Sequence, residues 1–279
     1  MATQLKQITL KKESNSYWRV IIENPPINMM DFRTVTELQE VINLLEANDQ
    51  LNIVVFESAN PDYFIAHFDL ASPMAERPGP GPSGYSSSID FMIRLAKLPA
   101  LSVAAIRGRT RGLGCEFAYA CDVRFGSRET AVLGQPEVGI GLFPGGGGIE
   151  HLPLLVGRAR ALEIILGSED FDAVTAERYG WINRSIPDAA FVDFVDAFAR
   201  RVASFDHQAL AEAKRLINRA GLADHDAMVE SQRNFFAAWA WEGAKRRVAR
   251  INELGMGKHG DFELNMGKHL GNLIADNSQ

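Results

Sequence analysis

The sequence contains few cysteines: only Cys115 and Cys121 occur among its 279 residues. Both fall within one expected helix, and neither has the spacing or the histidine partners of a zinc site. The pattern therefore excludes a disulfide framework and predicts no metal centre. Because a chain without disulfides is typical of a reducing compartment, we expect a reduced, cytoplasmic protein.

Long hydrophobic runs and an excess of basic charge are also missing. No apolar run reaches the roughly 20 residues that a membrane-spanning helix needs, and the polar segment Met1–Lys12 does not resemble a secretory signal. The 35 acidic residues exceed the 29 basic ones, which gives a formal net charge of −6. The lack of a long apolar run predicts no membrane span. Because nucleic-acid binding needs a strongly basic face, we also expect no nucleic-acid partner.

The composition that remains is that of a globular protein with a large core, because 46% of the residues are hydrophobic and 23% are charged. Strand and helix patterns alternate over the first two thirds of the chain, and helical patterns dominate the rest. We expect a β/α core over residues 1–200 and a helical region over residues 201–279. The expected strands are 8–12, 18–22, 51–57, 100–106, 123–125 and 181–183, and the expected helices are 31–47, 87–98, 149–155, 158–167, 173–179, 188–204, 207–219 and 223–252.

Two segments carry no regular pattern. Residues 72–88 are rich in Pro, Gly and Ser, which predicts a mobile loop that is either a bare connector or a flap over a site. The motif Met256-Gly257-Lys258-His259 recurs at residues 266–269. We interpret that recurrence as chance similarity within a frayed tail.

Four aromatic residues crowd the C-terminal helices: Phe235, Phe236, Trp239 and Trp241. Neighbouring positions on a helix point in different directions, so one core cannot accept all four side chains. They indicate either packing against a second subunit or a wide internal helix.

Two glutamates in glycine-rich surroundings are the strongest chemical signal. Glu116 ends the sequence Gly112-Leu113-Gly114-Cys115-Glu116, and Glu137 follows Gly134-Gln135-Pro136. Paired carboxyl groups suit proton transfer, and glycine-lined backbone can offer free N–H groups to a substrate oxygen. The glycine run 145–148 is expected to allow a tight turn into a helix, since it lacks the Lys and Ser/Thr of a phosphate-binding loop.

Over nearly its whole length the chain resembles the enoyl-CoA hydratase/isomerase (crotonase) family. The matching segments are 24–28, 64–70, 104–124 and 134–157, in the family's order. The resemblance implies an α/β fold, a crotonase-like spiral of ββα units, with a helical C-terminal trimerisation region at residues 201–279. It also implies an acyl-CoA substrate, no cofactor other than the coenzyme A of that substrate, and a homotrimer or a dimer of trimers.

The resemblance also assigns roles to particular residues. The backbone N–H groups of Phe68 and Leu113 would form an oxyanion hole for the thioester oxygen, and the second lies at the start of the Glu116 helix. Glu116 would activate water and Glu137 would donate a proton to C2. Ala66, through its carbonyl group, together with Ile27 and Phe68, would line the coenzyme A site.

The chain departs from the family at the oxyanion hole, where His67 and Leu113 each replace a usual glycine. His67 is expected to crowd the acyl or pantetheine group or to make a polar contact with it. Arg109 and Arg111 are expected either to be solvated or to meet an acidic acyl group or a coenzyme A phosphate. We therefore treat these three residues as candidate modulators of the acyl pocket.

Three functions follow from these residues. The first is hydration of a 2-enoyl-CoA by both glutamates. The second is another acyl-CoA reaction of the family, namely double-bond isomerisation, thioester hydrolysis or decarboxylation, in which Glu137 alone acts as the base. The third is a non-catalytic module that binds acyl-CoA or a protein, which the replacements at His67 and Leu113 would allow.

Overall fold

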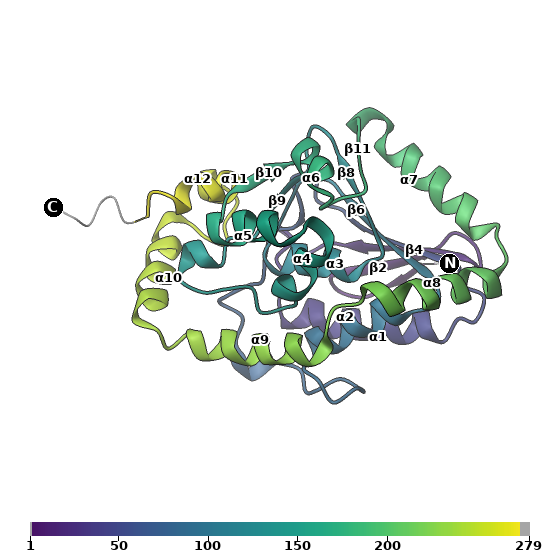
Figure 1. The fold of residues 1–279 in the computed structure, drawn as a ribbon, viewed down its shortest axis with the longest axis horizontal. Coiled ribbons are helices and arrows are strands. Elements are labelled where there is room, and N and C mark those ends of the chain that lie inside the picture. Colours follow the sequence, from purple (N-terminus) through teal and green to yellow (C-terminus); the bar gives the residue numbers. More distant parts are fainter. Residues whose placement is uncertain (1, 274–279) are drawn as a thin grey trace.

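The computed structural model describes residues 2–273, and its framework is two β-sheets wrapped by helices (Figure 1). The larger sheet has the strand order β1-β2-β3-β4-β6-β8-β11, and the smaller sheet has the order β10-β9-β7-β5. The strands of the larger sheet are β1 (Ala2–Gln4), β2 (Ile8–Lys12), β3 (Tyr17–Ile22), β4 (Ile53–Ser58), β6 (Leu101–Ile106), β8 (Val123–Ser127) and β11 (Arg184–Ile186). Those of the smaller sheet are β5 (Tyr63–Ile65), β7 (Arg109–Arg111), β9 (Val132–Gly134) and β10 (Asp170–Asp172).

Helices alternate with the strands in the first two thirds of the chain and make up most of the remainder. The α-helices are α1 (Phe32–Glu46), α2 (Ser87–Lys97), α3 (Leu113–Ala120), α4 (Gly148–Val156), α5 (Arg158–Gly167), α6 (Ala173–Tyr179), α7 (Asp188–Ala203), α8 (His207–Gly221), α9 (His225–Ala238), α10 (Glu242–Leu254), α11 (Asp261–Leu264) and α12 (Met266–Leu270). Two short 3₁₀ helices, η1 (Met74–Glu76) and η2 (Val138–Ile140), complete the elements. None of the helices within residues 2–273 combines the length and the hydrophobicity that crossing a membrane requires.

The two sheets are built by a repeated unit that places one strand in each sheet. β4, β5 and α2 form one unit, β6, β7 and α3 form the next, and β8 and β9 begin a third. The parallel pairs β4–β6 and β6–β8 stack these units side by side in the larger sheet. The fold is therefore the expected α/β spiral of ββα units.

The apolar run in β4 shows why this strand is central. Ile53 and Val55 pack into the cluster beneath α7, whereas Val54 and Phe56 pack into the main core on the opposite face. Because both faces of a parallel sheet are covered, every position of such a strand is apolar rather than every second one. The prediction of a buried strand in this segment is confirmed.

The start of α1 also follows the local sequence. The Asp31 carboxylate accepts the Thr34 N–H at 2.7 Å, which satisfies one of the free donors at the helix start. The antiparallel β2–β3 pair and the helices α1 and α2 lie where the sequence pattern predicted them.

The part of the chain after α5 differs from the sequence prediction at several elements. The strand expected at 181–183 lies at Arg184–Ile186, and β10 was not predicted. The single helix expected over 223–252 is two helices, because the chain turns at Trp239 and packs that residue against the cluster around Ile140 and Leu142.

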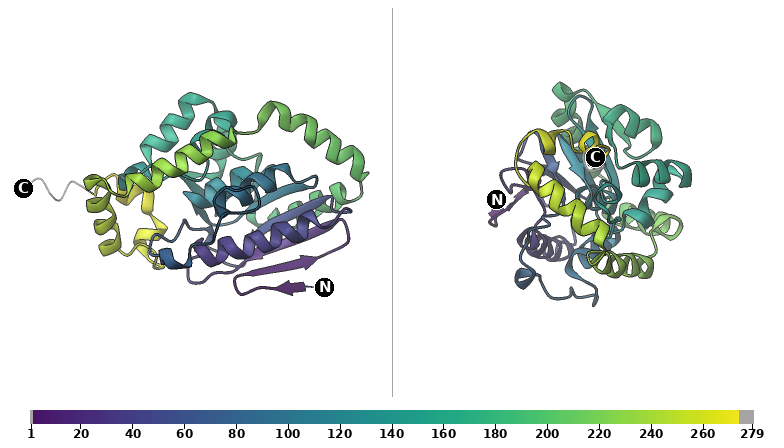
Figure 2. Two further views of the ribbon diagram at one scale, coloured as in Figure 1. Left: turned by 90° about the horizontal axis from the view of Figure 1, so that it is seen from below. Right: turned by 90° about the vertical axis from the view of Figure 1, so that its left-hand side faces the viewer.

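The segment interpreted as a frayed tail is folded up to residue 273. α11 and α12 bring the chain back to β10, at the end of the molecule opposite α7 (Figures 1 and 2). Met266 and Phe262 are buried there, and they draw the segment onto the core through apolar contacts. The frayed-tail interpretation is therefore wrong for the described part of this segment.

Candidate active site

A cavity of about 90 Å³ brings together residues from widely separated parts of the chain. Both glutamates and both predicted oxyanion donors lie on its wall: Glu116, Glu137, Phe68 and Leu113. His67 lines the same cavity, as do Phe235, Phe236 and Met256 from the C-terminal region. The fold therefore brings the two glutamates, the two predicted oxyanion donors and His67 to one place.

Glu116 projects from the first turn of α3 and is almost fully buried. Its Oε1 accepts the backbone N–H groups of Gly146 at 2.8 Å and Gly148 at 2.9 Å. A Cβ atom on Gly146 would lie 2.4 Å from Glu116 Oε2, so only glycine lets the backbone come this close. The glycine run thus binds a carboxylate in addition to turning the chain into α4, a role that sequence reasoning missed.

Burial has the largest effect on the pKa of Glu116. It raises the pKa of this carboxyl from 4.5 to about 7, against the two glycine N–H groups, which lower it. The two hydrogen bonds also fix which oxygen is engaged, because both end on Oε1. A carboxyl with this pKa can exchange a proton near neutral pH.

Glu137 follows β9 and begins η2, and it is also buried. Burial, and after it the nearby charge of Glu116, raises the pKa of Glu137 well above the usual range of a glutamate. Its Oε2 lies 3.4 Å from the amide nitrogen of Gln135, a neutral donor. Burial and the neighbouring carboxylate therefore both favour the protonated form of Glu137.

Gly112, the residue before α3, lies against the Glu137 side chain. It has a φ of 51°, a conformation that side-chain-bearing residues rarely adopt, and a Cβ atom there would lie 2.6 Å from Glu137 Oε1. The next residue, Leu113, is the first of the helix, so its N–H has no partner within the helix. The backbone turn at Gly112 therefore leaves the Leu113 N–H free on a residue that lines the cavity together with Glu137.

The special role of Gly112 predicts a local loss of stability. Gly112→Ala should lower the free energy of unfolding by about 1–3 kcal/mol, because it combines backbone strain with a steric clash. Gly243→Ala is the matched control, since a Cβ atom there meets nothing within 4 Å and its φ is ordinary. Denaturant unfolding would measure both variants, and equal stability of Gly112→Ala and wild type would contradict the prediction.

Phe68 presents the other free N–H group. A short β-bridge pairs it with Met30: the Met30 N–H donates to the His67 carbonyl at 2.9 Å, and the Asp69 N–H donates to the Met30 carbonyl at 3.0 Å. Among residues 2–273, no protein atom accepts the N–H of either Phe68 or Leu113. Both predicted donors are therefore free and lie on the same cavity wall.

His67 is buried, and both of its ring nitrogens are engaged. Nδ1 lies 2.8 Å from the Phe68 carbonyl oxygen, and Nε2 lies 2.9 Å from Glu263 Oε1. Sequence reasoning missed Glu263, because it belongs to the segment interpreted as a frayed tail.

The arginines predicted to modulate the acyl pocket lie elsewhere. Arg111 is fully buried and binds Asp170 through two nitrogens, at 2.6 and 2.9 Å. Arg109 donates to the carbonyl of Leu264 at 2.9 Å. Neither lines the cavity, because β7 turns both side chains toward α11 and β10, so this interpretation of Arg109 and Arg111 is corrected.

The predicted coenzyme A residues fall into two groups. Phe68 lines the cavity, whereas Ile27 and Ala66 are fully buried in a small cluster with Tyr63, against which Leu264 packs. Coenzyme A contacts of these three residues stay predictions.

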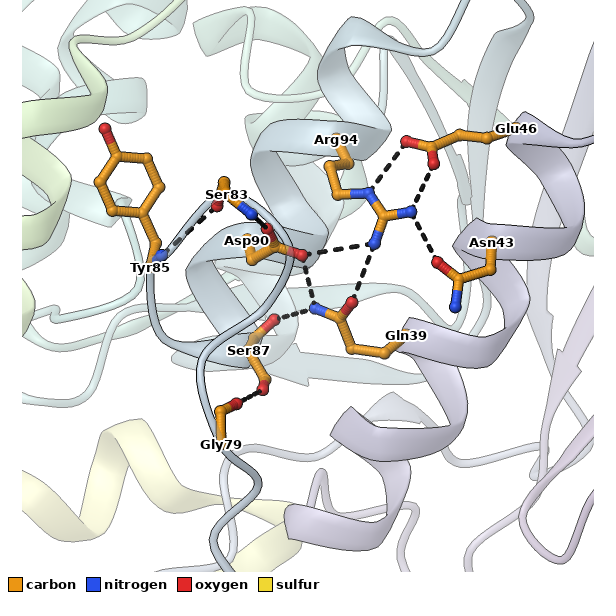
Figure 3. A network of polar contacts seen from close by, with 9 residues as sticks. All are labelled: Gln39, Asn43, Glu46, Gly79, Ser83, Tyr85, Ser87, Asp90 and Arg94. Carbon is orange, nitrogen blue, oxygen red and sulfur yellow. Dashed lines mark hydrogen bonds and ion pairs between the residues drawn. The ribbon is translucent and has the colours of Figure 1, made fainter.

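The loop 72–88 covers part of the cavity, as the flap interpretation expected. Arg77, Pro78 and residues 86–88 are on the cavity wall. The loop is anchored at its C-terminal half, because buried Asp90 accepts the Ser83 N–H at 2.9 Å and a hydrogen bond from Gln39 at 2.9 Å (Figure 3). A hydrogen bond from Ser87 Oγ to the Gly79 carbonyl closes the base of the loop.

Two of the four C-terminal aromatics face this cavity. Phe235 and Phe236 line it, and Trp239 packs edge-on against Phe235. Trp241 keeps 55% of its surface exposed. The surplus of aromatic residues is therefore largely explained within one chain, by the pocket wall and the cluster beside it.

Comparisons with known proteins agree with one another. The family model described as enoyl-CoA hydratase/isomerase matches residues 12–244. A short-chain-enoyl-CoA hydratase of Clostridium acetobutylicum is 28% identical over 233 residues, which cover 84% of this chain and 89% of that protein. The fatty acid oxidation complex subunit alpha of Vibrio vulnificus is 30% identical over 224 residues, 79% of this chain but only 32% of that longer protein.

The solved structures extend the likeness to the whole fold. A Streptomyces avermitilis protein assigned as an enoyl-CoA hydratase is 37% identical and superimposes with a TM-score of 0.91. The match covers 97% of this chain and 98% of that one.

Proposed function

Because this chain belongs to the enoyl-CoA hydratase/isomerase family, we propose that it adds water to the double bond of a 2-enoyl-CoA thioester. The observation that carries the proposal is the cavity itself, where two buried carboxyl groups and two free backbone N–H groups share one wall. Hydration needs a base for water, an acid for C2 and hydrogen-bond donors for the thioester oxygen. The two carboxyl groups can act as the base and the acid, and the two N–H groups as the donors.

The reaction begins with the thioester carbonyl between the N–H groups of Phe68 and Leu113. Ionised Glu116 accepts a proton from water as the water oxygen bonds to C3, and the π electrons of the double bond move toward the thioester oxygen. Protonated Glu137 then delivers its proton to C2, which restores the carbonyl. The glutamate pair holds one proton before and after the addition, so no external acid or base is consumed.

The different surroundings of the two carboxyl groups support this division of roles. Both carboxyl groups are buried, but Glu116 keeps two N–H donors that favour its charged form, whereas Glu137 faces the charge of Glu116. Glu116 is therefore the easier of the two to ionise and is suited to act as the base. We propose that coenzyme A enters only as part of the substrate and that the chemistry needs no further cofactor.

Loss of the absorbance of the conjugated enoyl thioester tests the proposed function. Wild-type protein should consume at least one 2-enoyl-CoA in a series of increasing chain length. A folded protein that leaves every member of the series unchanged would refute hydration.

The proposed base predicts the acid limb of the pH profile. Since the pKa of Glu116 is about 7 and the ionised form is active, kcat/KM should fall about tenfold for each unit below pH 7. At higher pH, loss of the Glu137 proton should produce the second limb. Initial rates between pH 5.5 and 9 would show these limbs, and a flat profile from pH 5.5 to 7 would contradict the assignment.

Assembly into a homotrimer or a dimer of trimers is part of the same proposal. Large apolar side chains such as Leu154, Ile217 and Trp241 are more than half exposed on the single chain. Apolar surface of this kind supports contact with further copies.

A further inference from the structure

A buried ion pair connects the cavity to the C-terminal helix α11. His67 Nε2 lies 2.9 Å from Glu263 Oε1, although the two residues are 196 positions apart in the sequence. His67 is 5% exposed and Glu263 is 0% exposed. The proposed hydration uses neither side chain, so the burial of this pair beside Phe68 requires another explanation.

The hydrogen bonds around the histidine ring determine where its protons lie. Nδ1 faces the Phe68 carbonyl oxygen at 2.8 Å, and a carbonyl only accepts, so Nδ1 carries a proton. Nε2 faces Glu263 Oε1, which also accepts the Gly257 N–H at 2.7 Å. An imidazolium that donates from both ring nitrogens, facing a carboxylate, fits this arrangement.

The electrostatic environment agrees with that state. Burial, the largest single effect, lowers the pKa of His67, but the Glu263 charge and the hydrogen bonds to Glu263 and Phe68 together outweigh it, and the net pKa is raised. Burial is also the largest effect on Glu263 and raises its pKa, but the His67 charge, the hydrogen bonds from His67 and Gly257 and the Arg111 charge together outweigh it, and the net pKa is lowered. The geometry and the charges thus favour the same protonation state.

The groups packed around this pair hold α11 in place. Arg111 donates to the Glu263 carbonyl at 2.8 Å and is itself held by Asp170, and Arg109 donates to the Leu264 carbonyl. The remaining titratable neighbour is Tyr63, whose pKa is raised by burial and then by the Glu263 charge. Of these groups, His67 alone touches the cavity wall.

The pair completes the hydrogen bonding around Phe68. The peptide before Phe68 is fixed because the His67 carbonyl accepts the Met30 N–H, and the peptide after it is fixed because Asp69 donates to Met30. The Phe68 carbonyl is fixed by His67 Nδ1. Only the Phe68 N–H is left without a protein partner among the described residues.

We propose that Glu263 and His67 act together as positioning residues for the Phe68 N–H, so that helix α11 is a required part of the oxyanion hole. This inference rests on the proposed function, because it takes that N–H as a donor to the thioester oxygen. A charged His67 also adds a positive charge at the residue next to the Phe68 N–H, and such a charge favours the negative charge that develops on the bound thioester oxygen.

The variant Glu263→Gln tests the pair. It should lower kcat about 10- to 100-fold with KM within about twofold of wild type, because the oxyanion contact strengthens only in the transition state. Without its carboxylate partner, burial should bring the pKa of His67 below its ordinary value, so the ring should be neutral at neutral pH and the remaining activity should fall further as the pH rises from the acidic range. The wild-type profile should lack this limb.

Asp261→Asn is the matched control. Asp261 lies on the same helix and also pairs with a histidine, His269, at 2.8 Å, but it is 76% exposed and lies outside the cavity. Its kcat and KM should match those of wild type. A Glu263→Gln variant with wild-type kcat, or with a raised KM and unchanged kcat, would overturn the inference.

A second measurement separates this inference from the proposed function and does not depend on whether Glu263→Gln folds. Nitrogen NMR of wild-type protein labelled at histidine should show His67 with both ring nitrogens protonated at a pH above about 6.5, where a free imidazole is mostly neutral, and a neutral ring would overturn the inference. If wild type hydrates no enoyl-CoA, hydration fails, while the NMR result still decides whether the charged pair exists.

Discussion

Glu137→Gln should lower kcat for hydration by about 10³- to 10⁴-fold and should remove any double-bond isomerisation as well. Glutamine has nearly the shape of glutamic acid, but its amide cannot give a proton to C2 or take one from it. Because both reactions pass a proton at C2, both depend on Glu137. The loss should appear in kcat rather than in the affinity for a saturated acyl-CoA, which calorimetry would measure.

Glu37→Gln is the control for this experiment. Glu37 is a buried carboxyl that accepts the N–H groups of Lys6 and Gln7, at 3.2 and 2.8 Å, and it lies outside the cavity. Its replacement should leave kcat within about twofold of wild type. A Glu137→Gln protein with more than a tenth of the wild-type kcat would exclude Glu137 as the proton donor.

Glu116→Gln should lower hydration about 10³-fold while leaving isomerisation largely intact. The Gln oxygen can still accept the N–H groups of Gly146 and Gly148, so the variant removes the base without disturbing the glycine run. Rates of water addition and of double-bond migration, measured on the same protein, give the comparison. If hydration survives this substitution, Glu116 does not activate the water.

The same variant should be more stable than wild type at pH 8. The folded-state pKa of Glu116, about 7, exceeds its unfolded value of 4.5, so the stability that this group contributes is lost as the pH rises through 7. Glutamine carries no charge to bury, so the variant should gain about 1–3 kcal/mol at pH 8 and much less at pH 5. This gain would show that the loss of activity is not a loss of folding.

The sequence by itself determined much of this protein. The apolar run of β4, the Asp31 cap of α1 and the two glutamates in their glycine settings could all be read locally. Such features depend on the spacing of apolar residues and on neighbours a few positions away, and both can be read from the sequence. The family resemblance, confirmed over residues 12–244, then supplied the spiral that joins them.

Only the tertiary structure decided how distant residues meet. Glu263 reaches His67 across 196 positions, Arg109 and Arg111 turn away from the cavity, and the glycine run closes on Glu116 through backbone N–H groups. A sequence pattern gives the direction of a side chain relative to its own helix or strand, but its partner depends on the path of the whole chain. The segment after residue 255 shows this most clearly, because its short helices gain their order from the buried pair and the core they cover.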